Sequence, residues 1–472
     1  MAGKLVQKWA REQQRYNSDA MRELLGIGFS DEDDKRLSDA LQQLKCAKVL
    51  RTVTGKESDN EDNDTDSPWD RRYVEKYDYC FRYVGLIQFG KHLLNILPKY
   101  CTEIGISDTG DSYKEIFRTV MRVLARYKTE TSSTGEEDSE DAWHDFLHVM
   151  VELVVDFQAK GVYRVDENIN EVNGKGRIMW PRTIRRVLPL MQDGRPYYME
   201  LHTRRKQADT AHFITRLHKH LVWEAWQKLE KLDLPELLGL PTITDPPDHE
   251  EEFTDTEYLV RMVQKEQTQR FDNRRKYLLD LMLRYLEEKD EDTTDGIYLF
   301  GKSGFHVVWE EACRVVFGMR ASNETEMEPS APIWKLKGKK EHKGRCLQAD
   351  MVKVEENTLT IYDAKYYTPP VNVEPAKILA GMPGIGDIIK QQLYELALIK
   401  SWQKQRPYIR MNKNVFILPR RNDDVTTDND IGMVKVPMLT ELGLAPVEIC
   451  KVKPDTIWNA YLNRHTIKDI PK

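Results

Sequence analysis

The sequence predicts a multidomain protein of the α/β class, in which helical and strand-like segments alternate along one chain. Its 472 residues exceed the usual size of a single domain, which is roughly 100–200 residues. Hydrophobic residues make up 40% of the chain and charged residues 31%, and the mean hydropathy is −0.63. This composition is typical of a folded protein with a highly charged surface. It excludes integral membrane proteins and wholly disordered chains.

Four segments are expected in chain order. Residues 1–54 predict an amphipathic helical segment, and residues 55–70 predict an acidic linker. Residues 71–290 predict a region of mixed strand and helix that binds a partner or DNA. Residues 291–472 also mix helix and strand, and they contain the candidate chemistry.

Within residues 71–290, apolar patterning predicts several elements. Residues 81–90 are partly aromatic and β-branched, and with residues 92–98 they read as a hairpin of two strands. Apolar residues at helical spacing predict helices over 142–159, 217–230 and 258–288.

The net charge of −6 is unevenly distributed. Residues 291–472 contain 26 Lys and Arg against 24 Asp and Glu, or +2, so residues 1–290 carry −8. Much of this negative charge lies in acidic runs that are typical of solvated linkers. The overall sign therefore neither supports nor excludes nucleic-acid binding, and local clusters must decide.

The cysteines and the start of the sequence bear on the cellular compartment. No two cysteines form a Cys-x-x-Cys pair, which predicts reduced thiols rather than disulfides or a zinc site. The first residues lack the apolar core of a signal peptide, and no run approaches about 18 uninterrupted apolar residues. We therefore expect a cytoplasmic protein that does not enter a membrane.

Two strand-like runs lie on either side of Glu356 and Asn357. If these two residues form a turn, Asp350 lies directly opposite Asp363. Side chains two residues apart share one face of a strand, so Lys365 joins the two carboxylates on that face.

This arrangement suits the hydrolysis of phosphodiesters. Two facing carboxylates should repel each other in a hairpin, and a divalent cation such as Mg²⁺ between them removes that objection. A neighbouring ammonium can orient a water and offset charge on the phosphate. The alternative is an exposed hairpin in which Asp350, Asp363 and Lys365 are simply solvated.

The hairpin is expected between two helices. Residues 304–317 predict a helix that contains Glu310 and Glu311. Residues 386–398 predict another, in which Lys390 and Tyr394 lie one turn apart.

This order of helix, acidic hairpin and helix resembles the core of the PD-(D/E)XK nucleases. Several motifs narrow the resemblance to the LlaJI-type restriction endonuclease family, which is related to McrC. The motifs are Trp309-Glu310, Ala349-Asp350, Tyr362-Asp-Ala-Lys-Tyr-Tyr367 and Asp387-Ile-Ile-Lys-Gln-Gln-Leu-Tyr394, with weaker agreement at residues 83–100 and 174–184. The resemblance runs from about residue 80 to 400.

The resemblance implies a C-terminal PD-(D/E)XK core, with a mixed sheet flanked by helices, that cleaves DNA with Mg²⁺ as cofactor. Asp350, Asp363 and the Ala364 carbonyl would then bind the metal. Lys365 would position the attacking water, and Glu310 would complete the acidic site.

Three departures from the family pattern affect these assignments. Ala349 stands where the superfamily motif has proline. Lys390 holds the position at which many relatives have glutamine, so the supporting polar residue on this helix is Lys390, Gln391 or Tyr394. A helical wheel places Glu311 beside the apolar stripe, whereas the family pattern favours Glu310.

Two clusters of basic residues could contact DNA. The first comes just before Asp350, and a solvated loop is its competing interpretation. It consists of Lys335, Lys337, Lys339, Lys340, Lys343 and Arg345. The second surrounds Trp180 and, in isolation, is more typical of a structural basic face. It consists of Arg177, Arg182, Arg185 and Arg186.

The resemblance also implies a restriction role in defence against phage, with double-stranded DNA as substrate and an AAA+ GTPase of the McrB type as partner. In that case nucleotide hydrolysis would come from the partner. The alternative is an interaction subunit, similar to McrC, that mainly docks on the GTPase and stimulates it.

Overall fold

The computed structural model divides the chain into two compact units. Unit 1 combines residues 1–145 with residues 294–472, and unit 2 is formed by residues 146–293. The sequence assigned residues 71–145 to the middle region, whereas in the structure they group with the C-terminal segment.

The structure describes most but not all of the chain, and the predicted linker over residues 55–70 lies outside the described part. The described residues are 6–53, 79–105, 113–134, 146–209, 211–231, 234–240, 242–244, 253–268, 272–289, 297–317, 326–327, 330–337, 339–369, 381–403, 407–424, 429–467 and 470. In these ranges no helix is long and apolar enough to cross a membrane.

A four-stranded sheet forms the N-terminal part of unit 1. Its strands, in order, are β1 (Val6–Arg11), β6 (His92–Leu97), β5 (Tyr83–Phe89) and β12 (Ile297–Ser303). The predicted helical segment over residues 1–54 is therefore wrong for Val6–Arg11, which form a strand. Strand β1 pairs in parallel with β6, more than eighty residues away, and buries Trp9 and Ala10, so tertiary pairing overrides the local helical pattern.

The predicted hairpin at residues 81–98 is confirmed. Strands β5 and β6 pair in an antiparallel register that matches Phe89 with His92, which leaves a two-residue turn. Gly90 in this turn has a φ of 55°, a conformation that glycine adopts without steric cost.

Two helices and a small second sheet complete this region. They are α1 (Ser18–Leu25), α2 (Asp31–Cys46) and the strands β2 (Arg15–Tyr16), β4 (Tyr79–Phe81) and β3 (Leu50–Thr52). A capping box begins α2, since the side chains of Ser30 and Asp33 each accept a hydrogen bond from the other residue's backbone N–H. The two helices bury apolar side chains such as Leu24 and Leu41 against Ile87 of β5.

A mixed five-stranded sheet forms the C-terminal part of unit 1, which confirms the predicted α/β class. Its strands, in order, are β17 (Met351–Glu355), β18 (Thr358–Ala364), β19 (Arg410–Pro419), β21 (Val447–Val452) and β20 (Asp430–Val434). The two inner pairs are parallel, and the two outer pairs are antiparallel.

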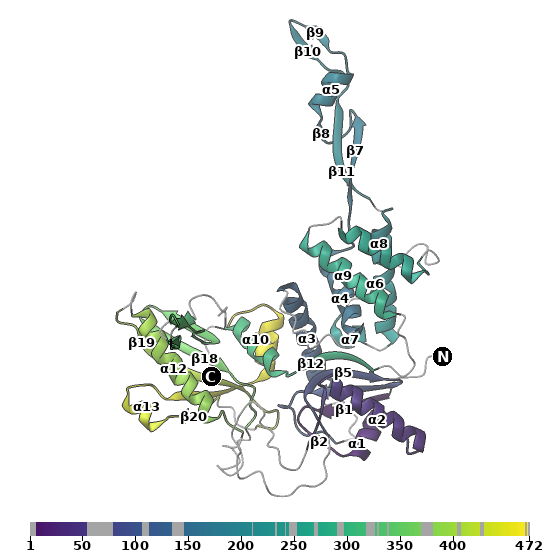
Figure 1. Ribbon diagram of the computed structural model, residues 1–472. Helices are drawn as coiled ribbons and strands as arrows, with labels where there is room; N and C mark the ends of the chain where they lie inside the picture. The colour runs from purple at the N-terminus through teal and green to yellow at the C-terminus, as the bar shows by residue number, and fades with distance from the viewer. Residues whose placement is uncertain are drawn as a thin grey trace. The chain divides into compact units, whose positions relative to one another are not determined.

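Helices pack on both faces of strand β18 (Figure 1). The helices of this part are α3 (Lys114–Thr134), α10 (His306–Val316), α12 (Ile385–Trp402), α13 (Pro437–Glu441) and α14 (Pro454–Leu462). Leu359 and Ile361 share a buried cluster with Tyr394 of α12, whereas Tyr362 stacks on Phe317 at the end of α10. Since successive side chains alternate across a strand, α10 and α12 approach opposite faces of β18.

Unit 2 contains a group of packed helices. They are α4 (Phe146–Lys160), α6 (Phe213–Lys231), α7 (Leu234–Leu238), α8 (Thr256–Thr268) and α9 (Asn273–Lys289). The helical pattern predicted over 258–288 covers two helices rather than one, because α8 ends at Thr268 and α9 begins at Asn273.

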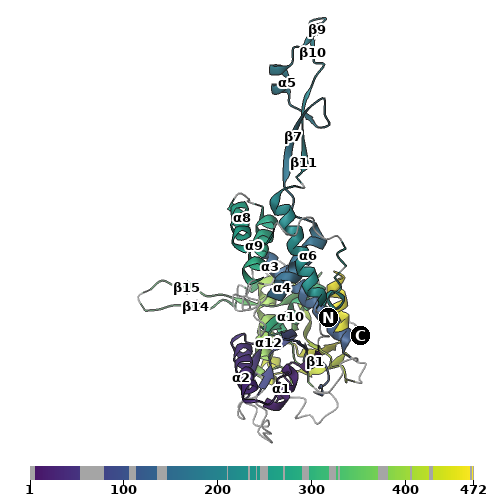
Figure 2. The ribbon, with the colours of Figure 1, turned by 90° about the vertical axis from the view of Figure 1, so that its right-hand side faces the viewer.

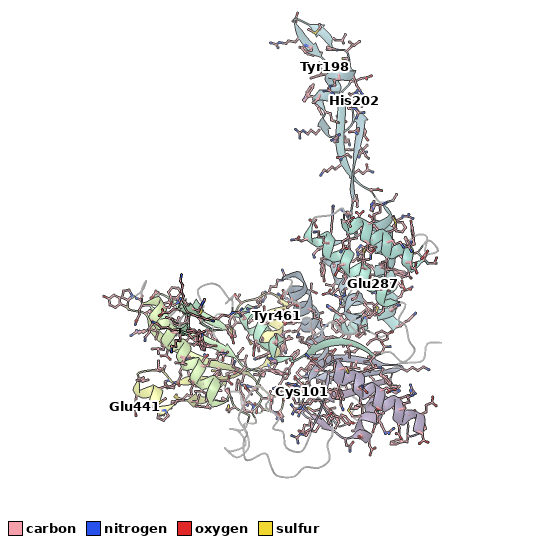
Figure 3. All side chains as sticks on the ribbon, viewed as in Figure 1. Cys101, Tyr198, His202, Glu287, Glu441 and Tyr461 are labelled. Atoms are coloured by element: carbon pink, nitrogen blue, oxygen red, sulfur yellow. The ribbon has the colours of Figure 1, made fainter. Side chains whose placement is uncertain are left out.

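A narrow arm extends from the helices of unit 2 (Figure 1). Strands β7 (Asp166–Val172) and β11 (His202–Ala208) form its antiparallel stem. Its outer part contains β8 (Arg177–Ile178), α5 (Trp180–Arg186), β9 (Leu190–Gln192) and β10 (Arg195–Tyr197). Figure 3 shows side chains on both sides of this arm, with Tyr198 and His202 labelled.

Candidate nuclease site

The turn and register predicted for the acidic hairpin are confirmed. Strands β17 and β18 pair antiparallel, with Met351 opposite Tyr362 and Glu355 opposite Thr358. Glu356 begins the turn with a φ of 48°. Extending this register by one residue brings Asp350 opposite Asp363, and their side chains are hydrogen-bonded.

Asp363 is a buried carboxylic acid. Its side chain lies on the same face of β18 as Leu359 and Ile361, and the residue is 3% exposed. Burial raises the pKa of Asp363 well above its usual value, and the contact with Asp350 raises it further, whereas Lys365 opposes the shift. The ionised form of Asp363 is therefore disfavoured beside Asp350, and a bound cation would offset that effect.

Lys365 lies beside this pair, with its Nζ 3.3 Å from Oδ2 of Asp363. Burial would lower the pKa of Lys365, but four surrounding carboxylates outweigh this effect and raise it. These carboxylates belong to Asp363, Asp350, Glu310 and Asp387. The backbone N–H of Lys365 donates to the Ile417 carbonyl at 2.9 Å, which fixes the chain where β18 ends.

The two glutamates of α10 have different surroundings. Glu311 forms an ion pair with Arg314 on its own helix. Glu310, by contrast, is close enough to Lys365 to raise its pKa. Of the two acids, Glu310 is therefore the one whose charge acts on Lys365.

One face of α12 carries polar groups toward the same centre. Lys390 hydrogen-bonds to Tyr394, and the charge of Asp363 influences both side chains. Gln391 is fully buried and donates to Oδ1 of Asn414 on β19 at 2.8 Å. Of the three supporting candidates, Lys390 and Tyr394 thus lie near the carboxylates, while the amide of Gln391 is bound to β19.

Asp387 is a member of this cluster that the sequence reasoning missed. Its carboxylate raises the pKa of Lys365 and accepts a hydrogen bond from the hydroxyl of Tyr367 at 3.3 Å. Asp387 lies one turn before Lys390 and two turns before Tyr394 on α12. That helical spacing was the signal that could have identified it.

A second missed contact links this segment to the N-terminal sheet. The hydroxyl of Tyr366, the residue after Lys365, donates to Oε2 of Glu12 at 2.8 Å. The same carboxylate oxygen accepts the backbone N–H of Lys99 at 3.1 Å, and Nζ of Lys99 lies 4.5 Å from the centre of the Tyr366 ring. More than 350 residues separate Glu12 from Tyr366, so no local pattern indicates the pair.

The chemistry of the donors fits Mg²⁺. Asp350 and Asp363 offer carboxylate oxygens in direct contact, and Mg²⁺ is usually held by one or two carboxylates and several waters. Among the described residues, no group of three or more His, Cys, Asp and Glu side chains is arranged to hold a metal. Side chains alone therefore do not enclose the ion, and the Ala364 carbonyl and waters would complete its coordination.

The basic residues before Asp350 lie on a separate exposed hairpin of unit 1, which Figure 2 shows as a projection. Strands β14 (Ile333–Trp334) and β15 (His342–Lys343) pair antiparallel, and all six predicted DNA-contacting side chains are exposed. Lys335 is paired with Glu341 at 3.1 Å. A second short pair, β13 (Glu326–Met327) with β16 (Leu347–Gln348), leads directly into Asp350.

Comparisons with known proteins agree with the resemblance seen in the motifs. The model of the LlaJI restriction endonuclease family matches residues 83–451. The chain is 28% identical over 407 residues to the type II restriction enzyme BsuMI component YdjA of Bacillus subtilis (strain 168), and the alignment covers 82% of each chain. A structure of Thermococcus gammatolerans McrB AAA+ hexamers with bound McrC matches at a TM-score of 0.39 and 14% identity, over 97% of this chain and 99% of that one.

Proposed function

Because the chain belongs to the LlaJI restriction endonuclease family, we propose that it is a Mg²⁺-dependent DNA endonuclease of a phage-defence system. One observation carries the proposal. Asp350, Asp363 and Lys365 meet at one end of a hairpin, and the charge of Glu310 on α10 acts on Lys365. Acids gathered around a lysine, with Asp363 buried, cost stability, and such perturbed groups are typical of functional sites.

Each residue has a distinct role in the proposed PD-(D/E)XK mechanism. Asp350, Asp363 and the Ala364 carbonyl hold the metal, and Glu310 completes the acidic side of the site. When bound, Mg²⁺ supplies positive charge to the phosphate and makes a water more acidic. The Nζ of Lys365 orients that water and stabilises the charge that develops on the phosphate oxygens.

A plasmid-cleavage assay tests this proposal. The purified chain is incubated with methylated and unmethylated plasmid DNA, with Mg²⁺ or with EDTA, across a salt series. We expect cleavage that requires Mg²⁺ and disappears in the Asp363→Ala protein. Cleavage that persists in EDTA, or that survives the substitution, would contradict the assigned site.

We also propose that an McrB-like AAA+ GTPase activates the chain. The proposal rests on the family resemblance. The sequence does contain a Gly-x-x-x-x-Gly-Lys-Ser pattern at residues 296–303, but Ile297–Ser303 form strand β12, paired antiparallel with β5, and not a phosphate-binding loop that opens a helix. A nuclease that cut readily alone would also damage its own host genome. We expect little specific cleavage by the isolated chain and strong stimulation by the partner with GTP. Efficient site-specific cutting by the chain alone would contradict this coupling while leaving the active site intact.

A role as an interaction subunit is the second candidate, and the arm of unit 2 favours it. Monomeric surfaces rarely expose many large apolar side chains close together, and such patches are typical of docking surfaces. The exposed apolar side chains of the arm are Val172, Trp180, Ile184, Leu188, Leu190, Met191, Tyr197 and Met199. Stimulation of GTP hydrolysis by the catalytically dead Asp363→Ala chain would separate this role from cleavage.

A further inference from the structure

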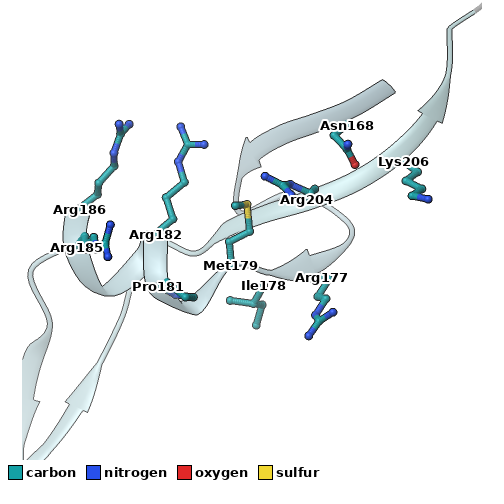
Figure 4. Close-up of a pocket in the computed structure, with 10 residues that line it drawn as sticks. All are labelled: Asn168, Arg177, Ile178, Met179, Pro181, Arg182, Arg185, Arg186, Arg204 and Lys206. Carbon is teal, nitrogen blue, oxygen red and sulfur yellow. The ribbon is translucent and has the colours of Figure 1, made fainter. Parts of the chain in front are cut away.

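The arm of unit 2 contains a hollow that is lined mainly by cationic side chains. Its volume is about 830 Å³, and β7, β8, β11 and α5 all contribute to it. The ten described residues that line it include five arginines and one lysine, and no aspartate or glutamate. The six are Arg177, Arg182, Arg185, Arg186, Arg204 and Lys206 (Figure 4).

The strand pairing explains why no acid lies directly opposite Arg204 or Lys206. Arg204 and Lys206 share one face of β11, and the residues opposite them on β7 are Asn170 and Asn168. Arg204 donates to the Asn170 amide oxygen at 3.1 Å, which is a neutral partner. Glu171 lies on the other face of this ladder, where it pairs with Arg205 at 3.0 Å.

The helix adds like charges to the same hollow. Arg182 and Arg186 lie one turn apart on α5, and Figure 4 shows their side chains next to each other and pointing the same way. Like charges at this spacing destabilise a helix. In addition, Nε of Arg182 is buried and has no hydrogen-bond partner among the described residues.

Local packing holds α5 in this position. The Thr183 hydroxyl accepts the backbone N–H of His202 at 3.0 Å, and the Met179 N–H donates to the His202 carbonyl at 2.7 Å. Gly176, with a φ of 147°, lets the preceding loop approach β11, because a Cβ there would lie 2.5 Å from the Arg204 carbonyl oxygen. The cationic groups are therefore gathered on a defined surface.

The charge of the arm is opposite to that of its surroundings in the sequence. Residues 166–208 contain nine Lys and Arg against five Asp and Glu, or +4, while residues 1–290 as a whole carry −8. Arginine forks match phosphate oxygens, and a polyanion would relieve the repulsion between neighbouring guanidinium groups.

We infer that this cationic hollow binds the phosphate backbone of DNA, as a contact separate from the cleavage site. The inference depends on the proposed function only in the choice of duplex DNA as the polyanion. Phosphate contacts hold a protein on the duplex without reading its sequence. The hollow thus contributes to the affinity for DNA and does not select a DNA sequence.

The test measures DNA binding in EDTA with the full-length Asp363→Ala chain, so that cleavage plays no part. Arg182→Gln/Arg186→Gln and Arg204→Gln/Lys206→Gln are each compared with the parent by fluorescence anisotropy across a salt series. Each pair should weaken binding roughly tenfold and reduce the salt slope by about two, since each lost phosphate contact removes about one from the slope. Because the two double variants change different elements, one of them still tests the inference if the other misfolds. Circular dichroism shows whether each variant is folded.

The matched control is Arg195→Gln on β10, which removes an exposed charge from the same arm outside the hollow. It should change the affinity less than twofold. Parent-like binding by both double variants would overturn the inference. So would an equal loss in the control, which would indicate general charge attraction. Unchanged DNA binding with lost binding of a partner protein would instead identify the hollow as a protein-docking surface.

Discussion

The hairpin site of unit 1 and the arm of unit 2 both gather ionisable side chains, but the sign of the excess charge differs between them. Around Lys365, the carboxyl groups of four acids surround one ammonium in a partly buried setting. In the arm, six cations share a hollow that has no carboxylate among its described lining residues. The first cluster has an excess of negative charge, and the second an excess of positive charge.

This difference indicates what each region lacks. The hairpin favours a cation, because burial and the neighbouring Asp350 disfavour the ionised form of Asp363 and raise its pKa. The arm favours an anion, because no carboxylate occurs among the described residues that line the hollow of guanidinium groups. A substitution in the hairpin should therefore change chemistry, whereas a substitution in the arm should change binding.

The largest effect is expected from Asp363→Ala. Loss of this carboxylate removes a metal ligand, so cleavage should fall by at least roughly 100- to 1,000-fold. The protein should stay folded, and without metal it could gain stability because a buried, repelled carboxyl is lost. The measurement is plasmid cleavage together with thermal unfolding.

The control for this variant is Asp423→Ala, which removes an acid that pairs with Arg421 at 2.7 Å, away from the hairpin. It should leave cleavage unchanged. An equal loss of cleavage in both proteins would show that the hairpin carboxylate has no special role.

Lys365→Ala should separate binding from chemistry. The ammonium is one positive charge among several, so DNA affinity should stay within a few-fold. Turnover should fall by about 100-fold if Nζ acts on the water or the transition state. Lys353→Ala, on the paired strand β17, is the matched control and should retain turnover. If Lys365→Ala lowers binding and turnover equally, Lys365 is an ordinary phosphate contact.

Glu310→Gln and Glu311→Gln form a matched pair on one helix. Glu310 influences Lys365, while Glu311 pairs with Arg314. We expect Glu310→Gln to reduce turnover roughly tenfold, which is less than the roughly 100-fold or more expected for a group that transfers a proton. Glu311→Gln should change it less than twofold. The reverse order in single-turnover cleavage would reassign the helix acid.

Tyr366→Phe should have a smaller effect, through the position of Lys365. The change removes the hydroxyl that donates to buried Glu12, at a stability cost of about 1–3 kcal/mol. We expect a several-fold lower kcat with unchanged DNA affinity. Glu12→Gln keeps an acceptor oxygen and should retain more activity than Glu12→Ala. A lower Tm with an unchanged kcat would limit this contact to stability.

The smallest effect concerns pH and Mg²⁺. The folded protein holds a proton on Asp363 more tightly than the unfolded chain does, because its pKa is raised. Without metal, stability should therefore fall as the pH rises above about 4, the unfolded value, toward the raised folded pKa. Mg²⁺ competes with this proton, so it should raise the Tm more at pH 8 than at pH 5. Asp363→Asn should abolish that difference, and a pH-independent Mg²⁺ shift in the parent would contradict the site.

The sequence predicted the hairpin well, because its structure is local. The turn at Glu356 and Asn357 lies between two strand-like runs, so the alternation of side chains fixes which residues share a face. The same reasoning failed for Val6–Arg11, whose strand conformation depends on pairing with β6. Helical periodicity predicted α12 but left open whether Lys390, Gln391 or Tyr394 faces the carboxylates.

The sequence alone therefore determined which groups come together within one hairpin or one helix turn. One example is the placement of Asp350 opposite Asp363. Only the tertiary structure decided which distant groups join them. It brought Glu12 to Tyr366. It also placed Glu310 and Asp387 near Lys365, and in the arm it placed Arg204 and Arg182 around one hollow. The physical reason is that backbone geometry dictates spacing over a few residues, whereas contacts across tens or hundreds of residues depend on how sheets pair and helices pack.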